Sequence, residues 1–157
     1  MSKNISAAEQ TLGFLLRLPY EKLSQRVYGA LAERGFADIR AAHSVVFRYV
    51  ARTGSRVSEL AEQAHLTKQS MSYLVEGLAR DGYVTILPDP SDGRAKLVCL
   101  TARGHEVSEA LVTLSREVEE DFAARLAPGR MAALRGLLGE LADVLEAGGR
   151  RAMPNNR

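Results

Sequence analysis

The chain has 157 residues, of which 46% are hydrophobic and 25% charged. This composition excludes a disordered chain, and the length indicates one domain of ordinary size or one domain with helical extensions. Its net charge is only +2, so any binding to nucleic acid must come from local basic clusters. The single cysteine, Cys99, excludes an intrachain disulfide, and the lack of a membrane span or an apolar leader predicts a cytoplasmic protein.

The first part of the chain carries the apolar rhythm of a helix over residues 6–33. The apolar positions at this spacing are Leu12, Leu15, Leu16, Leu23, Val27 and Leu31. Proline lacks an amide donor and clashes with the preceding turn, so at Pro19 we expect either a kink or a break that opens a second helix. Gly35 is expected to cap the C-terminal end of this segment.

Two short helices and a longer one are expected next. Residues 39–51 have a helical pattern. A short strand near Ser55 then precedes Ser58, which is a suitable N-cap for the following helix. After a three-residue gap, Thr67 caps a helix that ends near Arg80. Two helices joined by so tight a turn are typical of a helix-turn-helix.

A β-hairpin follows these helices. Residues 83–87 and 95–100 are rich in β-branched, aromatic and aliphatic side chains, which favours two paired strands. Between them lies a segment dense in turn-forming residues, where Asp92 and Gly93 predict a tight turn because glycine accepts a positive φ. The tip of this hairpin should be exposed and should carry Arg94.

Two long helices are expected at the C-terminal end. Thr101 caps the first, Pro128 marks the break, and the second ends near residues 148–149. Residues 150–157 are expected to form a flexible tail. Both helices carry broad apolar stripes that one copy of the chain would leave exposed, so we predict that the terminal helices pack against a second copy in a homodimer.

The helix that begins after Thr67 should have one apolar and one polar face. The apolar face consists of Met71, Leu74, Val75 and Leu78, and the polar face and its flanks of Lys68, Gln69, Ser70, Ser72, Tyr73, Glu76 and Arg80. Gln69 can bond an adenine edge through two hydrogen bonds, and Lys68 can reach a guanine or a phosphate. Such a face is ordinarily a solvated surface, but the preceding helix and the following hairpin favour a DNA-reading helix.

The hairpin supplies a second candidate contact. Arg94 beside the turn can enter a minor groove, where negative potential is focused. Asp92, two residues earlier, can orient that guanidinium. The alternative is a surface ion pair that contributes little to stability.

The same residues resemble a known family. Residues 89–104, DPSDGRAKLVCLTARG, are similar to the wing signature of the multiple antibiotic resistance regulator (MarR) family of bacterial winged helix-turn-helix repressors. The segments SELA at 58–61, TKQS at 67–70 and LARDGYV at 78–84 resemble the family's two helices and its strand entry. The motif-level likeness is confined to about residues 55–104, and the architecture is similar over essentially the whole chain.

This resemblance implies a mainly α fold in which a winged helix-turn-helix is flanked by N- and C-terminal helices that form a dimerisation domain. Residues 1–36 and 105–149 would be the dimerisation region and residues 37–104 the DNA-binding domain. The implied partner is a palindromic double-stranded operator. One departure concerns Gly93, where the family often has a second wing arginine.

The resemblance also implies DNA contacts at named positions. Those positions are Lys68, Gln69, Ser70, Ser72 and Tyr73 on the recognition helix, with Asp92 and Arg94 on the wing. Family members commonly bind small aromatic or anionic effectors, and the residues that could line such a pocket are Arg17, Tyr20, His43 and Phe47. Packing or solvation explains these four equally well. Peroxide sensing is disfavoured because Cys99 lies in the wing strand, where a buried small residue is the better interpretation.

Two other readings of the chain differ in function. A winged helix can serve as a protein-interaction module that does not read DNA, and basic and acidic residues between positions 55 and 104 are about matched in number. An enzyme is the least supported reading, because no phosphate loop or nucleophile elbow is present. The three histidines share no metal-ligand spacing, so no cofactor is expected. The leading hypothesis is a dimeric repressor that a small ligand releases from DNA.

Overall fold

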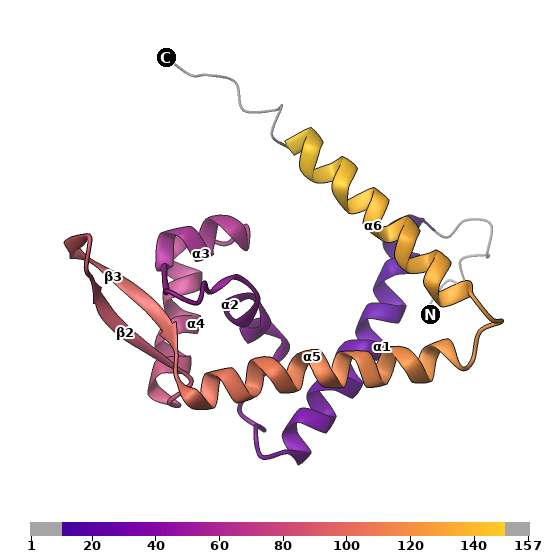
Figure 1. Ribbon diagram of the computed structural model, residues 1–157, viewed down its shortest axis with the longest axis horizontal. Helices are drawn as coiled ribbons and strands as arrows, with labels where there is room; N and C mark the ends of the chain where they lie inside the picture. The colour runs from indigo at the N-terminus through magenta and orange to yellow at the C-terminus, as the bar shows by residue number, and fades with distance from the viewer. Residues whose placement is uncertain (1–10, 150–157) are drawn as a thin grey trace, which may run out of the picture. The chain divides into compact units, whose positions relative to one another are not determined.

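A computed structural model describes residues 11–149 of the chain, which are mainly helical with one small antiparallel sheet (Figure 1). The chain divides into two compact units, residues 1–116 and residues 117–157. In the first unit, short helices lie beside a projecting hairpin, which confirms the predicted winged helix-turn-helix architecture (Figure 1). Within the described residues, no helix is both long and apolar enough to cross a membrane.

Helix α1 (Leu12–Glu33) is continuous, and Pro19 lies inside it. The alternative of a break at Pro19 is therefore wrong. A single proline removes one amide donor and leaves the other hydrogen bonds of a 22-residue helix in place. The N-cap is Thr11, whose hydroxyl accepts the Phe14 amide at 3.4 Å. Residues 6–10 of the predicted helix lie outside the described part of the chain.

The predicted helix over residues 39–51 is shorter than expected. The 3₁₀ turn η2 (Ala41–His43) leads into α2 (Ser44–Tyr49). The Arg40 amide donates to Nδ1 of His43 at 3.1 Å, which closes the first turn locally. At the other end Val50 is extended, and the Ala51 amide donates to the buried Ser55 hydroxyl at 3.0 Å. Side-chain bonds at both ends thus replace the outer turns of a longer helix.

Helices α3 (Val57–Gln63) and α4 (Lys68–Arg80) form the helix-turn-helix. The N-cap of α3 is Arg56 rather than the predicted Ser58, because the Glu59 carboxylate reaches back and accepts the Arg56 amide at 3.0 Å. Thr67 caps α4 as predicted, since its hydroxyl accepts the Ser70 amide at 3.1 Å.

The sheet has the strand order β1–β3–β2 and is antiparallel throughout. It consists of β1 (Ser55–Arg56), β2 (Val84–Asp89) and β3 (Asp92–Leu100). The turn lies at Pro90 and Ser91, because Asp89 pairs with Asp92, so the predicted turn at Asp92 and Gly93 is wrong. The Asp89 carboxylate accepts the amide and the hydroxyl of Ser91 at 2.8 and 2.6 Å, and Pro90 fixes φ between them.

Tyr83, just before β2, is fully buried and joins three segments of the first unit. Its hydroxyl donates to Oδ1 of Asp38 at 2.7 Å and accepts from the Arg103 guanidinium at 2.9 Å. That guanidinium lies 4.7 Å from the centre of the Tyr83 ring, a cation–π contact. Burial, and then the bond to Asp38, raise the pKa of Tyr83, so the phenol stays protonated and keeps donating.

Helix α5 (Ala102–Ala123) begins two residues after the end of β3. The Thr101 hydroxyl accepts the Gly104 amide at 3.1 Å, which confirms the predicted cap, and donates to the Gly82 carbonyl at 2.6 Å. A Cβ at Gly104 would overlap the carbonyl oxygen of Tyr83. Glycine is therefore needed here to let the first turn of α5 approach the backbone before β2.

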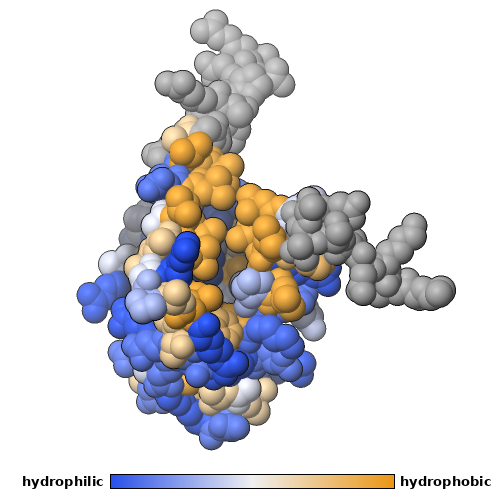
Figure 2. Space-filling model, turned by 90° about the vertical axis from the view of Figure 1, so that its right-hand side faces the viewer, coloured by the Kyte–Doolittle hydropathy of each residue, from blue (hydrophilic) through white to orange (hydrophobic). Residues whose placement is uncertain are grey.

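The core of the winged module includes side chains from the flanking helices, because Leu31 of α1 and Val107 of α5 are fully buried. Fully buried side chains come from α3, α4, the sheet and the neighbouring helices, and include Leu60, Met71, Val75, Leu78 and Val98. Helix α6 (Arg130–Gly149) is different, because Leu134, Leu137, Val144 and Leu145 are exposed on it. Figure 2 shows apolar residues open on the face turned to the viewer.

Candidate nucleic-acid interface

Helix α4 presents a polar face to solvent and anchors its opposite face in the core. Met71, Val75 and Leu78 are at most 1% exposed, which fixes the rotation of the helix. Gln69 and Tyr73, four residues apart, then point outward on one side, and the Tyr73 side chain is 74% exposed. An aromatic side chain so far from the core, beside an amide that can read a base edge, makes this face suited to base contacts.

The N-terminal end of α4 is open to solvent. Lys68, Gln69 and Ser70 are exposed, and free amides at a helix N-terminus favour an anion such as a phosphate. The Ser70 hydroxyl lies 2.8 Å from the Thr67 hydroxyl and takes part in the cap. Ser72 is half-buried on the flank of the helix. Of the predicted helix contacts, Lys68, Gln69, Ser70 and Tyr73 are therefore exposed, and the Ser70 hydroxyl is already used in the cap.

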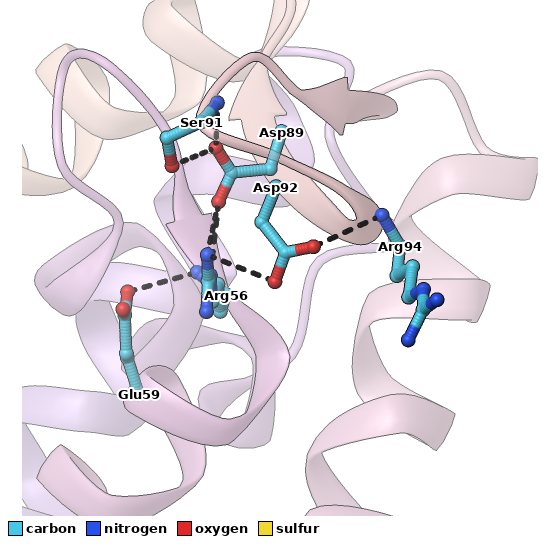
Figure 3. Close-up of polar contacts among 6 residues, drawn as sticks. All are labelled: Arg56, Glu59, Asp89, Ser91, Asp92 and Arg94. Carbon is cyan, nitrogen blue, oxygen red and sulfur yellow. Dashed lines mark hydrogen bonds and ion pairs between the residues drawn. The ribbon is translucent and has the colours of Figure 1, made fainter.

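The wing carries Arg94 on its exposed edge, three residues past Ser91 of the turn (Figure 3). The Asp92 side chain contacts the backbone of Arg94: its Oδ1 accepts a hydrogen bond from the Arg94 amide at 3.1 Å. The sequence suggested that Asp92 orients the Arg94 guanidinium, and the bond in the structure fixes the chain at Arg94 instead. The Arg94 side chain points away from the Asp92 carboxylate (Figure 3), and the residue is exposed.

A second arginine ties the wing to the helix-turn-helix. Nε and Nη2 of Arg56 lie 2.9 and 2.6 Å from Oδ2 of Asp89. A weaker approach of 3.7 Å joins Arg56 to Oδ2 of Asp92. The bonds from Ser91 and then those from Arg56 lower the pKa of Asp89 from 3.8 to about 2, so its carboxylate is charged throughout the neutral range. Asp89 also raises the pKa of Arg56.

The sequence did not identify Arg56 and Asp89 as functional positions. The order Asp89-Pro90-Ser91 is a turn signal with an Asp at its first place and a proline at its second, and it could have placed the turn correctly. The pairing of Asp89 with Arg56, 33 positions away, depends on the sheet register and has no local signal.

The four proposed pocket residues lie in different environments. Arg17 is exposed and bonds Glu21 on its own helix at 2.6 Å, and Tyr20 is also exposed. Phe47 is buried in the core. His43 is half-buried and accepts the Arg40 amide, and burial lowers its pKa. An effector pocket at these residues stays a prediction.

Cys99 is half-buried in β3 and lies against Gly54. Gly54 has a φ of +92°, and a Cβ there would come within 2.7 Å of the Cys99 sulfur. This close approach gives Cys99 a packing role. Among residues 11–149, His, Cys, Asp and Glu form no group of three that could hold a metal ion.

Comparisons with known proteins agree with this geometry. Residues 37–95 match the model of the MarR family. The chain is 30% identical over 90 residues to the transcriptional regulator HosA of Escherichia coli O111:H-, a match that covers 57% of this chain and 67% of HosA. It is 36% identical over 58 residues to the transcriptional activatory protein BadR of Rhodopseudomonas palustris. That match covers 37% of this chain and a third of BadR.

A solved structure resembles most of the chain. The MarR family protein RV2887 of Mycobacterium tuberculosis, determined in complex with salicylic acid, aligns with a TM-score of 0.66 and 27% sequence identity. The alignment covers 87% of this chain and 99% of that protein. HosA and BadR are both named as proteins of transcription regulation, and the alignment with RV2887 covers all but about an eighth of this chain.

Proposed function

The chain belongs to the MarR family of transcriptional regulators, and from this premise we propose that it is a sequence-specific DNA-binding protein that acts as a dimeric repressor at a palindromic operator. The observation that carries the proposal is the outward face of α4, where Gln69 and Tyr73 are exposed on a helix whose other face is locked in the core. A recognition helix needs both properties, because base contacts require a fixed angle of entry into the major groove.

The wing extends the contact to a second groove. Arg94 is exposed and its backbone is held by Asp92, so its guanidinium is available to a narrow minor groove beside the major groove that α4 enters. The near balance of charge over residues 55–104 means that a few placed residues, rather than a basic surface, supply the attraction to DNA.

The helices outside the module support assembly of two copies. Exposed side chains of α1 include Leu12, Leu15 and Leu18, and those of α6 include Leu137 and Val144. Apolar side chains in such number on two helices are a protein-interaction surface, and a second copy is the partner that the family relationship supports. Two modules related by twofold symmetry read half-sites about 34–36 Å apart, which makes the operator palindromic.

The proposal has two further parts: the bound protein represses transcription by occupying the operator, and a small ligand releases it from the DNA. A small anionic aromatic compound is the proposed effector, since RV2887 was determined with salicylic acid and this chain offers Arg17, Tyr20, His43 and Phe47 as candidate contacts. BadR is an activatory protein, so the direction of regulation is a property to be measured. The proposed site of action is the cytoplasm, where bacterial DNA lies.

The test is selection of bound duplexes from random or genomic DNA, followed by affinity measurements at two salt concentrations. A recovered palindrome and an affinity that falls steeply with salt are expected, because phosphate contacts release counterions. Transcription from a promoter carrying that site should fall when protein is added, and salicylate should reverse the effect. Equal affinity for selected and competitor DNA would instead favour a winged helix that binds protein.

A further inference from the structure

One charged cluster lies at the junction between the wing and the helix-turn-helix (Figure 3). Asp89 is the last residue of β2, and Arg56 ends β1 and caps α3. The two residues join elements that are separated by most of the module's sequence. Both lie outside the set of direct DNA contacts proposed above.

The Asp89 carboxylate is fully engaged. Its Oδ1 accepts two bonds from Ser91, and its Oδ2 accepts two from Arg56. Its side chain is only 7% exposed, whereas that of Arg56 is 36% exposed. Exposed ion pairs contribute little, but a buried carboxylate with every acceptor used fixes the orientation of the groups that it joins.

The cluster continues to the DNA-facing arginine. Asp92 approaches Arg56 through Oδ2 and holds the Arg94 amide through Oδ1. Arg56 is itself anchored to α3, because Glu59 accepts its amide. A continuous set of bonds therefore runs from the helix that precedes α4, through the turn of the wing, to the backbone of Arg94.

We infer that Arg56 and Asp89 are positioning residues for DNA binding: their bond fixes the wing relative to the helix-turn-helix, so that Arg94 meets the minor groove while α4 occupies the major groove. This inference rests on the proposed function. The strands of a two-stranded wing would otherwise bend and twist at their free end, and the two groove contacts would not be made together without a cost in ordering.

The substitution Asp89→Asn gives the clearest test, because two explanations predict opposite signs. It removes a negative charge near the DNA-facing surface and frees the Arg56 guanidinium. If charge alone mattered, DNA affinity would rise. If position matters, affinity should fall on the order of tenfold, the scale of one lost groove contact.

The experiment measures the affinity of the full-length protein for the duplex that it selects from random DNA. The variants are Asp89→Asn, Arg56→Gln, Arg56→Lys, Arg94→Ala and the double variant Arg56→Gln with Arg94→Ala. Glu21→Gln is the matched control, because it removes one carboxylate from the exposed Arg17–Glu21 pair. Hydrogen exchange of the wing amides in free protein reports the position of the wing without DNA.

Three results are expected. Asp89→Asn and Arg56→Gln weaken binding and speed exchange in the wing, while α4 exchanges as in the wild type and Glu21→Gln has no effect. Arg56→Lys recovers part of the affinity, since it restores the charge without the paired nitrogens. In the Arg94→Ala background, Arg56→Gln has little further effect, because it acts through Arg94.

Tighter binding by Asp89→Asn overturns the inference, and so does an Arg56→Gln effect that is undiminished in the Arg94→Ala background, which would mark Arg56 as a direct phosphate contact. The positioning role and the proposed function can fail separately. If Arg94→Ala weakens binding but Asp89→Asn does not, the positioning role is wrong and the DNA-binding proposal stands. If no selected duplex is bound, the proposed function itself fails.

Discussion

The winged module and the terminal helix α6 differ in how far their apolar side chains are buried. In the module, Leu60, Met71 and Leu78 are fully buried within one chain. Leu137 and Val144 of α6, by contrast, are 64% and 68% exposed. The module therefore buries its apolar side chains within one chain, whereas α6 leaves large apolar side chains open to solvent.

The difference supports the proposed division of DNA reading and assembly between the two regions. A DNA-reading surface must be rigid before DNA arrives, because a fixed face meets both grooves without a cost in ordering. A helical surface rich in leucine gains stability only when a partner removes it from water. We therefore expect substitutions in the module to change stability or base preference, and substitutions on the terminal helices to change assembly.

The largest effect is expected from carboxylates on α6. Leu137→Asp combined with Val144→Asp places two charges on the same face of α6, about two helical turns apart. A buried unpaired charge costs several kcal/mol, so the predicted homodimer should dissociate to a monomer at micromolar concentration. Sedimentation velocity measures the change, and DNA affinity should fall with it.

The control for this pair is Leu87→Asp on the wing, where the leucine is 48% exposed. It introduces the same charge at an exposed leucine outside the terminal helices, and the protein should remain a dimer. If the wild-type protein were a monomer, the terminal helices would not be an assembly surface, and the proposal of a palindromic operator would fail with the dimer.

The next effect concerns the packing of the module. In a helix, alanine is more favourable than glycine by about 1 kcal/mol. Gly104→Ala, however, would place a Cβ against the Tyr83 carbonyl oxygen. This oxygen belongs to the backbone, which cannot move aside as a flexible side chain can. Overpacking should win and lower the free energy of unfolding by about 1–3 kcal/mol. Thermal and urea unfolding measure this loss.

Gly29→Ala in α1 is expected to change the free energy of unfolding in the opposite direction. A Cβ at Gly29 meets no atom within 4 Å, so the substitution should leave the protein equally stable or stabilise it by up to about 1 kcal/mol. An equally stable Gly104→Ala variant would show that the first turn of α5 can move away from β2.

Most of the architecture could be predicted from the sequence, because its signals are local. Thr67 and Thr101 cap helices where the sequence placed them. The prediction of Ser58 as the α3 cap is wrong, because the Glu59 carboxylate accepts the Arg56 amide and makes Arg56 the cap. The break at Pro19 was wrong, because one missing donor does not outweigh the rest of a long helix.

The site was predictable only in part. The outward direction of Gln69 and Tyr73 follows from helical periodicity and needs no knowledge of distant residues. The bond between Arg56 and Asp89 could not be predicted, because it depends on which residue ends β2 and on where β1 joins the sheet. The turn position moved by two residues from Asp92 and Gly93, because a bond between the Asp89 and Ser91 side chains outweighed glycine's freedom.

A smaller and more local effect is expected at the recognition helix. Gln69→Ala should relax the preference for one base pair in each half-site by ~1–3 kcal/mol, and it should not change unfolding or assembly. Selection of bound duplexes by the variant, compared with the wild type, measures the change. Gln25→Ala, at an exposed glutamine of α1, is the matched control, and an unchanged selected sequence for Gln69→Ala would show that Gln69 faces solvent in the complex.

The smallest effect is the dependence of the module's stability on acid. The folded pKa of Asp89 is depressed from 3.8 to about 2, so its charged form stabilises the folded protein above about pH 4, and this contribution is lost as the pH falls toward about 2. The Asp89→Asn variant lacks this stabilisation at every pH, because its side chain carries no charge. The gap in free energy of unfolding between wild type and variant should therefore be constant at neutral pH and should narrow below about pH 4. Other carboxylates titrate in both proteins, so the difference isolates Asp89, and the chemical shift of its carboxyl carbon reports the same titration directly. A gap that stays constant across this range would mean that Asp89 titrates alike in both states, and that its bond to Arg56 adds no stability that protonation can remove.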